Sequence, residues 1–314
     1  MNENKNEEQK AEPEAQEMSP VLCVGMGLFI VFTAVIALML AAPFEASGVK
    51  AFQNPESVWN PVYFVILIMG FTAFILAVLR FGGQKLVHFV MLAAVAVTIY
   101  YVLLAVLTVP YAYIAITGTI ALTLLLYKYP EWYVLDATGL IIAGGAAAIF
   151  GISLIPQLIV LLMIILAMYD AIAVYKTKHM VSLAESIVDL RIPVLFVLPR
   201  KRNFSLLREK GQDKDKDKDK GKTEMEEAFF MGLGDAIIPS MLVVSANCMP
   251  ASIYYLGLIN APALGALIGT LAGYAVLSRI AGRGKPHAGL PFLNSGAIIG
   301  FLLGYFAFIF VYNV

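Results

Sequence analysis

The sequence predicts an all-α polytopic membrane protein with about nine transmembrane helices. Hydrophobic residues make up 60% of the 314 positions and charged residues only 14%, whereas a soluble domain carries about 25% charged residues. The mean hydropathy is +0.80, and the apolar residues fall in long uninterrupted blocks. Lysine and arginine gather in alternate loops between these blocks, as expected when a chain crosses a membrane repeatedly.

Nine apolar segments are long enough, or nearly so, to form a spanning helix of about 20 residues. In chain order they are residues 20–42, 61–79, 86–109, 111–126, 132–150, 156–175, 228–245, 256–278 and 290–311. Residues 1–18 before them are polar and acidic, and we predict a disordered tail. The first apolar segment is longer than the core of a secretory signal, about 7–15 residues, so we interpret it as a spanning helix.

The loop charges predict the orientation, because loops rich in lysine and arginine normally stay in the cytoplasm. Such residues follow the second, fourth, sixth and eighth segments. They include Arg80, Lys85, Lys128, Lys176, Lys178, Arg279, Arg283 and Lys285. The odd-numbered loops hold only Lys50. This alternation agrees with nine segments and predicts a cytoplasmic N-terminus and an external C-terminus.

A long cytoplasmic loop, residues 176–227, divides helices one to six (20–175) from helices seven to nine (228–314). For residues 180–199 we expect an amphipathic helix on the membrane surface; the alternative is a lid or substrate-docking element. The Asp-Lys repeat at 213–220 is typical of a solvated linker. It resembles a calcium loop only superficially, because Lys220 stands where the tight turn needs glycine.

Two aspartates lie inside apolar segments, Asp170 near the end of the sixth and Asp235 early in the seventh. A carboxylate at the centre of a membrane helix costs about 2.5–3.5 kcal/mol, so such residues usually mark a functional site. The sixth segment ends, and the seventh begins, at the cytoplasmic face. At the rise of an α-helix, the two carboxylates lie about 8 and 10 Å from that face. We therefore expect one shared site.

Two close carboxylates in a low dielectric do not both ionise easily, so the pair tends to share one proton. That state suits peptide hydrolysis, since the ionised member activates water and the protonated member donates to the scissile carbonyl. No metal or cofactor is needed. Gly232 and Gly234 fit a close approach of another backbone. The alternative is a glycine-rich helix contact in which the acids bond neighbouring side chains.

Other chemistries find little support in the sequence. Asp136 follows Trp132 and Tyr133, and we expect a role at the membrane interface or in hydrogen bonding. There is no His-Glu-x-x-His zinc motif, and the histidines lie at helix ends or in loops. Cys23 and Cys248 fall near opposite faces and should not pair. The formal net charge of zero gives no nucleic-acid footprint.

Three motifs of the chain resemble those of one known family. They are Tyr169-Asp170 on the sixth segment, Gly232-Leu233-Gly234-Asp235 on the seventh and Ala288-Gly289-Leu290-Pro291 at the start of the ninth. They look like the YD, GxGD and PAL motifs of the presenilin and signal peptide peptidase family. Ala288-Gly289 departs from the family's Pro-Ala. A literal Pro-Ala-Leu at 262–264 falls on the eighth segment, and we interpret it as coincidental.

The resemblance, from about residue 20 to residue 311, implies an intramembrane aspartyl protease with nine helices and Asp170 and Asp235 as catalytic residues. The orientation is similar to that of presenilins, and the simple loop resembles a microbial presenilin homologue in the cell membrane. The implied partners are membrane lipids and single-pass transmembrane substrates. Backbone at 288–290 would pair with the unwound peptide. Substrate identity and homo-oligomerisation stay open.

Two rival functions use the same residues differently. A proton- or cation-coupled transporter or channel could employ the aspartates as a relay. A helix broken near the midplane would favour it, whereas these acids lie off the midplane. A non-catalytic scaffold in a membrane assembly is the third interpretation.

Overall fold

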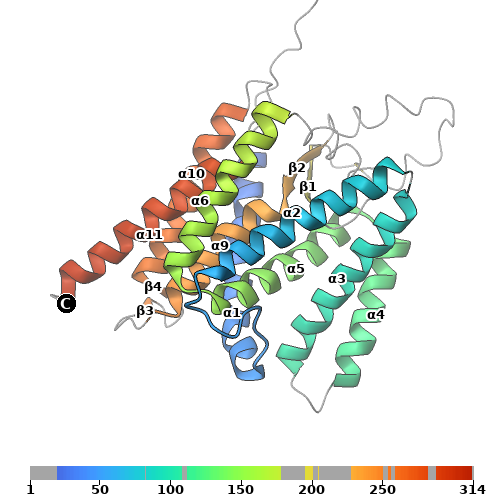
Figure 1. The fold of residues 1–314 in the computed structure, drawn as a ribbon, viewed down its shortest axis with the longest axis horizontal. Helices are drawn as coiled ribbons and strands as arrows, with labels where there is room; N and C mark the ends of the chain where they lie inside the picture. The colour runs from blue at the N-terminus through green and yellow to red at the C-terminus, as the bar shows by residue number, and fades with distance from the viewer. Residues whose placement is uncertain are drawn as a thin grey trace, which may run out of the picture.

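The computed structural model describes residues 20–81, 83–107, 112–177, 195–200, 204, 228–249, 254–255, 259–281 and 288–312. Within these ranges nine α-helices pack side by side (Figure 1). They are α1 (Pro20–Ser47), α2 (Trp59–Arg80), α3 (Gln84–Leu107), α4 (Ala112–Lys128), α5 (Trp132–Ser153), α6 (Pro156–Ile172), α9 (Leu233–Asn247), α10 (Ala261–Ala281) and α11 (Leu290–Tyr312). Seven are long and apolar enough to cross a membrane; α4 and α9 are shorter. The predicted multi-pass helical fold is confirmed.

Polar contacts near the helix ends agree with the alternating directions of the helices. After α1, the amide of Ala51 donates to Oγ of Ser153 at the end of α5, 2.7 Å away. At the beginning of α1, the thiol of Cys23 lies 3.1 Å from the hydroxyl of Ser278, near the end of α10. The ends that the loop charges assign to one face therefore lie together. Cys23 and Cys248 are both free thiols.

Two short strands replace parts of the helices that the sequence predicts. Strand β1 (Leu195–Pro199) lies within the stretch expected to form an interfacial helix, and β2 (Ala228–Gly232) replaces the first five residues of the seventh segment. They pair antiparallel, with Leu195 opposite Gly232. A five-residue apolar run cannot be assigned to helix or strand by its periodicity alone, which is why both expectations were wrong. Residues 180–194, 1–18 and 213–220 lie outside the described residues.

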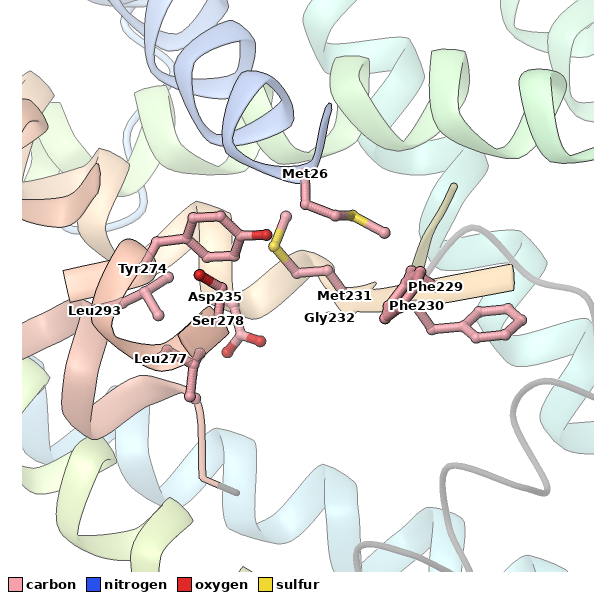
Figure 2. A pocket seen from close by; sticks show the side chains of 11 residues that line it. Met26, Phe229, Phe230, Met231, Gly232, Asp235, Tyr274, Leu277, Ser278 and Leu293 are labelled. Carbon is pink, nitrogen blue, oxygen red and sulfur yellow. The ribbon is translucent and has the colours of Figure 1, made fainter. Parts of the chain in front are cut away.

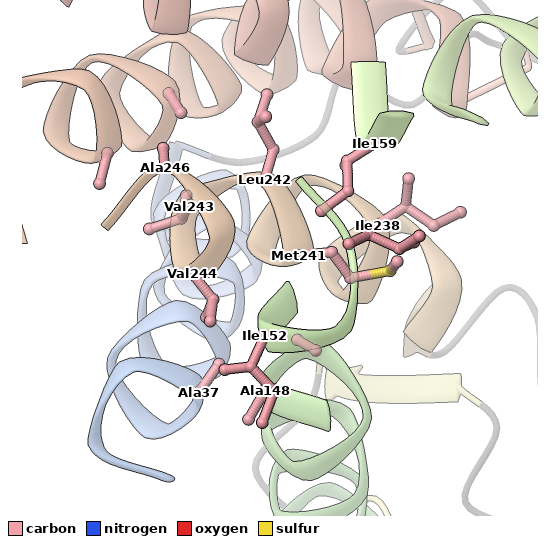
Figure 3. Close-up of a cluster of buried hydrophobic side chains, with 14 of the residues drawn as sticks. Ala37, Ala148, Ile152, Ile159, Ile238, Met241, Leu242, Val243, Val244 and Ala246 are labelled. Atoms are coloured by element: carbon pink, nitrogen blue, oxygen red, sulfur yellow. The ribbon is translucent and has the colours of Figure 1, made fainter. Parts of the chain in front are cut away.

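Helix α9 lies at the centre of the molecule and is buried along most of its length. Its side chains pack against α1, α5, α6, α10 and α11 in the largest apolar cluster, part of which Figure 3 shows. Met241, Leu242 and Val244 are completely buried there. A 15-residue helix is short for a full span, but protein surrounds α9 and β2 leads directly into it. Asp235, in the first turn of α9, therefore lies at the beginning of the central helix of the bundle.

Helices α10 and α11 contact each other backbone to backbone. A methyl group on Gly269 would collide with the carbonyl oxygen of Gly296, and one on Gly300 with that of Gly265. Glycine at these positions lets the two helices approach more closely than any side chain would permit. This contact fixes α11 against α10, and the N-terminus of α11 carries the third sequence motif. Another pair of short strands, β3 (Tyr254–Tyr255) and β4 (Ile259–Asn260), precedes α10.

Candidate active site

Asp170 lies near the C-terminal end of α6. The helix begins at Pro156, whose missing amide costs nothing at this position, and Asp170 is the third residue from its end. The chain then continues into a π-helical turn, η2 (Ala173–Thr177). Such turns are frequent at functional sites. The side chain of Asp170 is only 6% exposed. A carboxylate is thus held at the edge of the bundle, away from bulk solvent.

Asp235 lies in the first turn of α9, two residues after the helix begins at Leu233. Gly232 precedes it in an extended conformation, so β2 changes directly into helix. A negative charge in the first turn of a helix is favoured by about 0.3–1 kcal/mol through the helix dipole. The expected depth of Asp235 below the cytoplasmic face was wrong in detail. It was calculated from the rise of a helix that begins at Ala228, but the first five of those seven residues form strand β2.

A cavity of about 200 Å³ opens beside Asp235 (Figure 2). Its walls come from β2, from α1 and α10, and from the turn before α11. The lining residues include Met26, Met231, Gly232, Tyr274, Ser278 and Gly289. Most of the wall is apolar, and Asp235 supplies the only carboxylate among the residues that line it. The arrangement places one acid beside a small, partly open cavity.

The turn before α11 contacts both aspartates. The amide of Leu290 donates to Oδ2 of Asp170 at 3.2 Å, and the backbone of Gly289 also hydrogen-bonds Asp170. A Cβ on Gly289 would lie 3.2 Å from Oδ2 and 3.4 Å from Oδ1 of Asp235. The two carboxylates are close enough to interact electrostatically. Three segments far apart in sequence thus converge on one pair of acids.

The whole arrangement resembles that of known proteins. A family model described as "Signal-peptide peptidase, presenilin aspartyl protease" matches residues 26–310. The chain belongs to this family. Two solved structures of a presenilin family intramembrane aspartate protease, in space groups C222 and P2, are 35% and 36% identical to it. They cover 91% and 92% of this chain and 99% of their own, with TM-scores of 0.65 and 0.63. No curated protein matches.

Membership in the presenilin family supports the protease among the functions that the sequence allows. The chain is an intramembrane aspartate protease with membrane-protein substrates. Within the described residues, no group of three or more histidine, cysteine, aspartate or glutamate side chains is arranged to hold a metal ion. His88 contacts the ring of Tyr127, while His179 and His287 lie outside the described residues.

The other motif residues of this presenilin-family protease differ in their surroundings. A Cβ on Gly232 would lie 3.6 Å from the carboxylate of Asp235, so this glycine borders the acid. Gly234 is exposed, and a Cβ added to it would have no described atom within 4 Å. The space at Gly234 is therefore open, and the expected close approach of another backbone there stays a prediction. Ala288 is buried and Tyr169 is half-buried beside Asp170, while Pro291 lies in the first turn of α11.

The literal Pro-Ala-Leu at 262–264 lies far from the aspartates. It lies in the first turn of α10, where the amide of Ala263 donates a hydrogen bond to Oδ1 of Asn260. Pro262 packs near Gly304, which is fourteen residues beyond Leu290 on α11, or about 21 Å at 1.5 Å per residue. The sequence at 262–264 is thus at the other end of the α10–α11 pair.

Sequence reasoning missed several residues that position the site. Nδ2 of Asn294, a completely buried residue on α11, donates to the carbonyl of Met163 on α6 at 2.9 Å. This bond ties together the two helices that carry Leu290 and Asp170. The β1–β2 hairpin was missed as well. The sequence around Asn294 shows only a polar residue in an apolar helix. Its hydrogen-bond partner could not be predicted from that pattern, because Met163 lies 131 positions away.

Proposed function

We propose that Asp170 and Asp235 are the catalytic pair of this protease and that they hydrolyse a peptide bond inside a membrane-spanning substrate. The observation that carries the proposal is the single turn, Gly289 and Leu290, that contacts both acids. A shared backbone support fixes two carboxylates relative to each other without placing a cation between them. That arrangement favours one shared proton over two charges.

The reaction needs only water and the two acids. The ionised carboxylate takes a proton from water as the water oxygen attacks the carbonyl carbon of the substrate. The protonated carboxyl donates its proton to the carbonyl oxygen, which gives a tetrahedral diol. A proton then passes to the amide nitrogen, the C–N bond breaks, and a new carboxyl and a new amine leave. No bond forms between enzyme and substrate.

The Leu290 amide favours Asp170 as a fixed, oriented member of the pair. Oδ2 of this carboxylate accepts the bond from Leu290, and the backbone of Gly289 also bonds the same side chain. Asp235 borders the cavity, where a water molecule and a substrate carbonyl can reach it. The shared proton belongs to the pair and not to one acid, because the pair titrates as a unit.

The β-hairpin supplies a place for an unwound substrate. In the register of the strands, Val197 lies opposite Phe230, and the amide of Val197 bonds Asp136 instead of β2. This pair is therefore one of the non-hydrogen-bonded pairs of the ladder, and Phe230 turns its own amide and carbonyl away from β1. Among the described residues none hydrogen-bonds this amide and carbonyl of Phe230, so the outer edge of β2 can accept an extended peptide, which is the β-addition mode of recognition.

A substrate strand on this edge would lie between β2 and the turn at 288–291. Phe230, Gly232 and Gly289 all line the cavity beside Asp235, so the edge and the acids share one space. Adding the strand satisfies backbone groups that a substrate exposes when its helix unwinds, which is essential in an apolar environment. We propose single-pass helices of the cell membrane as substrates, cut near the cytoplasmic face.

A reconstituted cleavage assay tests the proposal. The purified full-length protein in lipid vesicles receives a single-pass helical substrate, and mass spectrometry identifies the fragments. We expect a cut within the membrane helix, lost in Asp170→Asn and Asp235→Asn. The matched control is Glu56→Gln, an exposed loop acid that should cleave normally. Cleavage that persists in either aspartate variant would overturn the proposal.

A further inference from the structure

We propose that Asp136 is a positioning residue that anchors the β-hairpin to α5, so that β2 and Asp235 are held in register for the substrate strand. The inference rests on the proposed function, since it assumes that the substrate pairs with β2. It assigns a role to the third aspartate of the apolar segments, which does not reach the catalytic pair.

The contact itself is short and buried. Asp136 is 5% exposed, and its Oδ1 accepts a hydrogen bond from the amide of Val197 at 2.8 Å. The two residues are 61 positions apart in the sequence. Oδ2 has no hydrogen-bond partner in the part of the chain that the structure describes. One oxygen therefore makes the whole contact, and an asparagine can supply the same acceptor.

The next turn of α5 is shaped for the same strand. The ring of Phe196 is completely buried and stacks on Phe29, with ring centroids 4.6 Å apart and an angle of 7°. A Cβ on Gly139 would lie 3.3 Å from this ring, so glycine makes room for it. Asp136 holds the backbone of β1, and Gly139 accepts the neighbouring side chain. Together they dock β1 on α5.

The docked strand connects directly to the catalytic helix. β1 pairs with β2 along all five residues, and β2 passes into α9 without a loop. Leu233, the first residue of α9, also packs against Gly139. A Cβ added to Gly139 would lie 3.6 Å from a methyl carbon of Leu233. Asp235 follows two residues later. A displacement of β1 would therefore be transmitted through β2 to the position of Asp235.

The same bond determines which edge of the hairpin can accept a peptide. Asp136 occupies the outward amide of Val197, and Pro199 has no amide to offer. Of the outward positions of β1, only Leu195 is then left with an amide for strand addition. The outer edge of β2, which faces the cavity, keeps all three outward amides, at Ala228, Phe230 and Gly232. Asp136 consequently directs an extended substrate to the side of the hairpin where the catalytic pair lies.

Two variants at Asp136 separate the bond from the charge. Asp136→Asn keeps the acceptor, while Asp136→Leu removes it at similar size. Thr138→Val is the matched control, because Thr138 is equally buried on α5 but bonds only Val134 and Leu135 of its own helix. The assay measures kcat, KM and the cleavage positions with a single-pass substrate, together with the melting temperature.

We expect Asp136→Asn to retain kcat/KM within about threefold, since one neutral hydrogen bond replaces a charged one. Asp136→Leu should lower kcat/KM about tenfold, mainly through KM, because the substrate must then order the hairpin as it binds. Its fragments should also end at a wider range of positions. Thr138→Val should lower the melting temperature without altering KM or the fragment pattern.

A variant of the donor provides an independent test. Val197→Pro removes the amide that Asp136 bonds and leaves the bonds between β1 and β2, because this amide points away from β2. It should reproduce the KM and fragment pattern of Asp136→Leu even if the leucine variant does not fold. The double variant should be no worse than either single variant, because both remove one bond.

Three results would overturn the inference. The first is a loss of kcat/KM in Asp136→Asn as large as that in Asp136→Leu, and the second is a normal KM and fragment pattern in both Asp136→Leu and Val197→Pro. The third is a double variant whose loss of kcat/KM is the sum, in free energy, of the two single losses. Failure of the proposed catalytic pair is recognised separately. It would appear as cleavage by Asp170→Asn, whatever the variants at Asp136 do.

Discussion

The amide of Leu290 donates a hydrogen bond to Oδ2 of Asp170 across 120 positions of sequence. Backbone amides keep their direction when side chains around them change, so this bond holds the carboxylate in a fixed orientation. It also explains why a motif almost without functional side chains lies at the centre of the site. The neighbouring Gly289 brings the same turn against Asp235.

The first prediction concerns the catalytic pair as a unit. Asp170→Asn and Asp235→Asn should each reduce cleavage by at least about a thousandfold, and the double variant should be no slower, because neither acid works alone. Initial rates with one substrate at saturating concentration measure this. Melting temperatures close to that of the unaltered protein show that the fold is intact. Multiplying losses in the double variant would mean that the acids act independently.

The second prediction concerns the dependence on pH. Cleavage should follow a bell-shaped profile. On the acid side the rate falls as the pair takes up a second proton and no base remains. On the alkaline side it falls as the shared proton is lost and no acid remains. Rates over a series of buffers at constant ionic strength measure both limbs. A rate that keeps rising on the alkaline side would show that no protonated carboxyl is needed.

The third prediction concerns inhibitors. Cleavage should survive metal chelators and serine-directed reagents, and the variant with both Cys23→Ser and Cys248→Ser should remain active. A peptide isostere carrying a hydroxyl at the scissile carbon should block it, because that hydroxyl resembles the tetrahedral diol. Residual activity after each treatment is the measurement. Loss on chelation that zinc restores would point to a different chemistry.

The fourth prediction concerns Gly289. A Cβ there would lie within 3.2–3.4 Å of the carboxylate atoms of Asp235, and the branched side chain of valine would press on them further. Gly289→Val should therefore lower kcat at least about tenfold while the protein still folds. The control is Gly70→Val on α2, which has nothing within 4 Å among the described atoms. Equal turnover in both variants would show that the turn at 288–291 is only a packing feature.

The fifth prediction concerns orientation. Lys50 follows α1 and should be external, and Lys128 ends α4 and should be cytoplasmic. In a background without Cys23 and Cys248, Lys50→Cys and Lys128→Cys are exposed to an impermeant thiol reagent in oriented vesicles. Only the first should react from outside. Reaction of both from the same side would contradict the alternation of nine spanning segments.

The sequence predicts most of the helices and the meeting of the two aspartates. Apolar length alone was sufficient for the helices, because lipid leaves a spanning backbone few alternatives. Asp170 and Asp235 were expected together because consecutive antiparallel segments bring the end of one beside the beginning of the next. The structure agrees: both acids contact the turn before α11.

The hairpin could not be predicted in the same way. Each strand has five residues, which is too short for a periodicity to show, and the partner of β1 lies beyond residues 200–227. The bond from Val197 to Asp136 is likewise non-local, so the sequence could indicate only a hydrogen-bonding role for Asp136. Local patterns therefore determined the helices, whereas long-range pairing determined the details of the site.

The glycine contact between α10 and α11 makes the catalytic centre sensitive to distant changes. Gly300 is ten residues along α11 from Leu290, about 15 Å away by helical rise. Because the two backbones touch there and again at Gly269 and Gly273, a displacement of one helix also displaces the other. A methyl group added at Gly265 or Gly300 would push the helices apart and shift α11, and with it the amide of Leu290 that holds Asp170. Damage to catalysis can therefore begin at residues that contact neither aspartate.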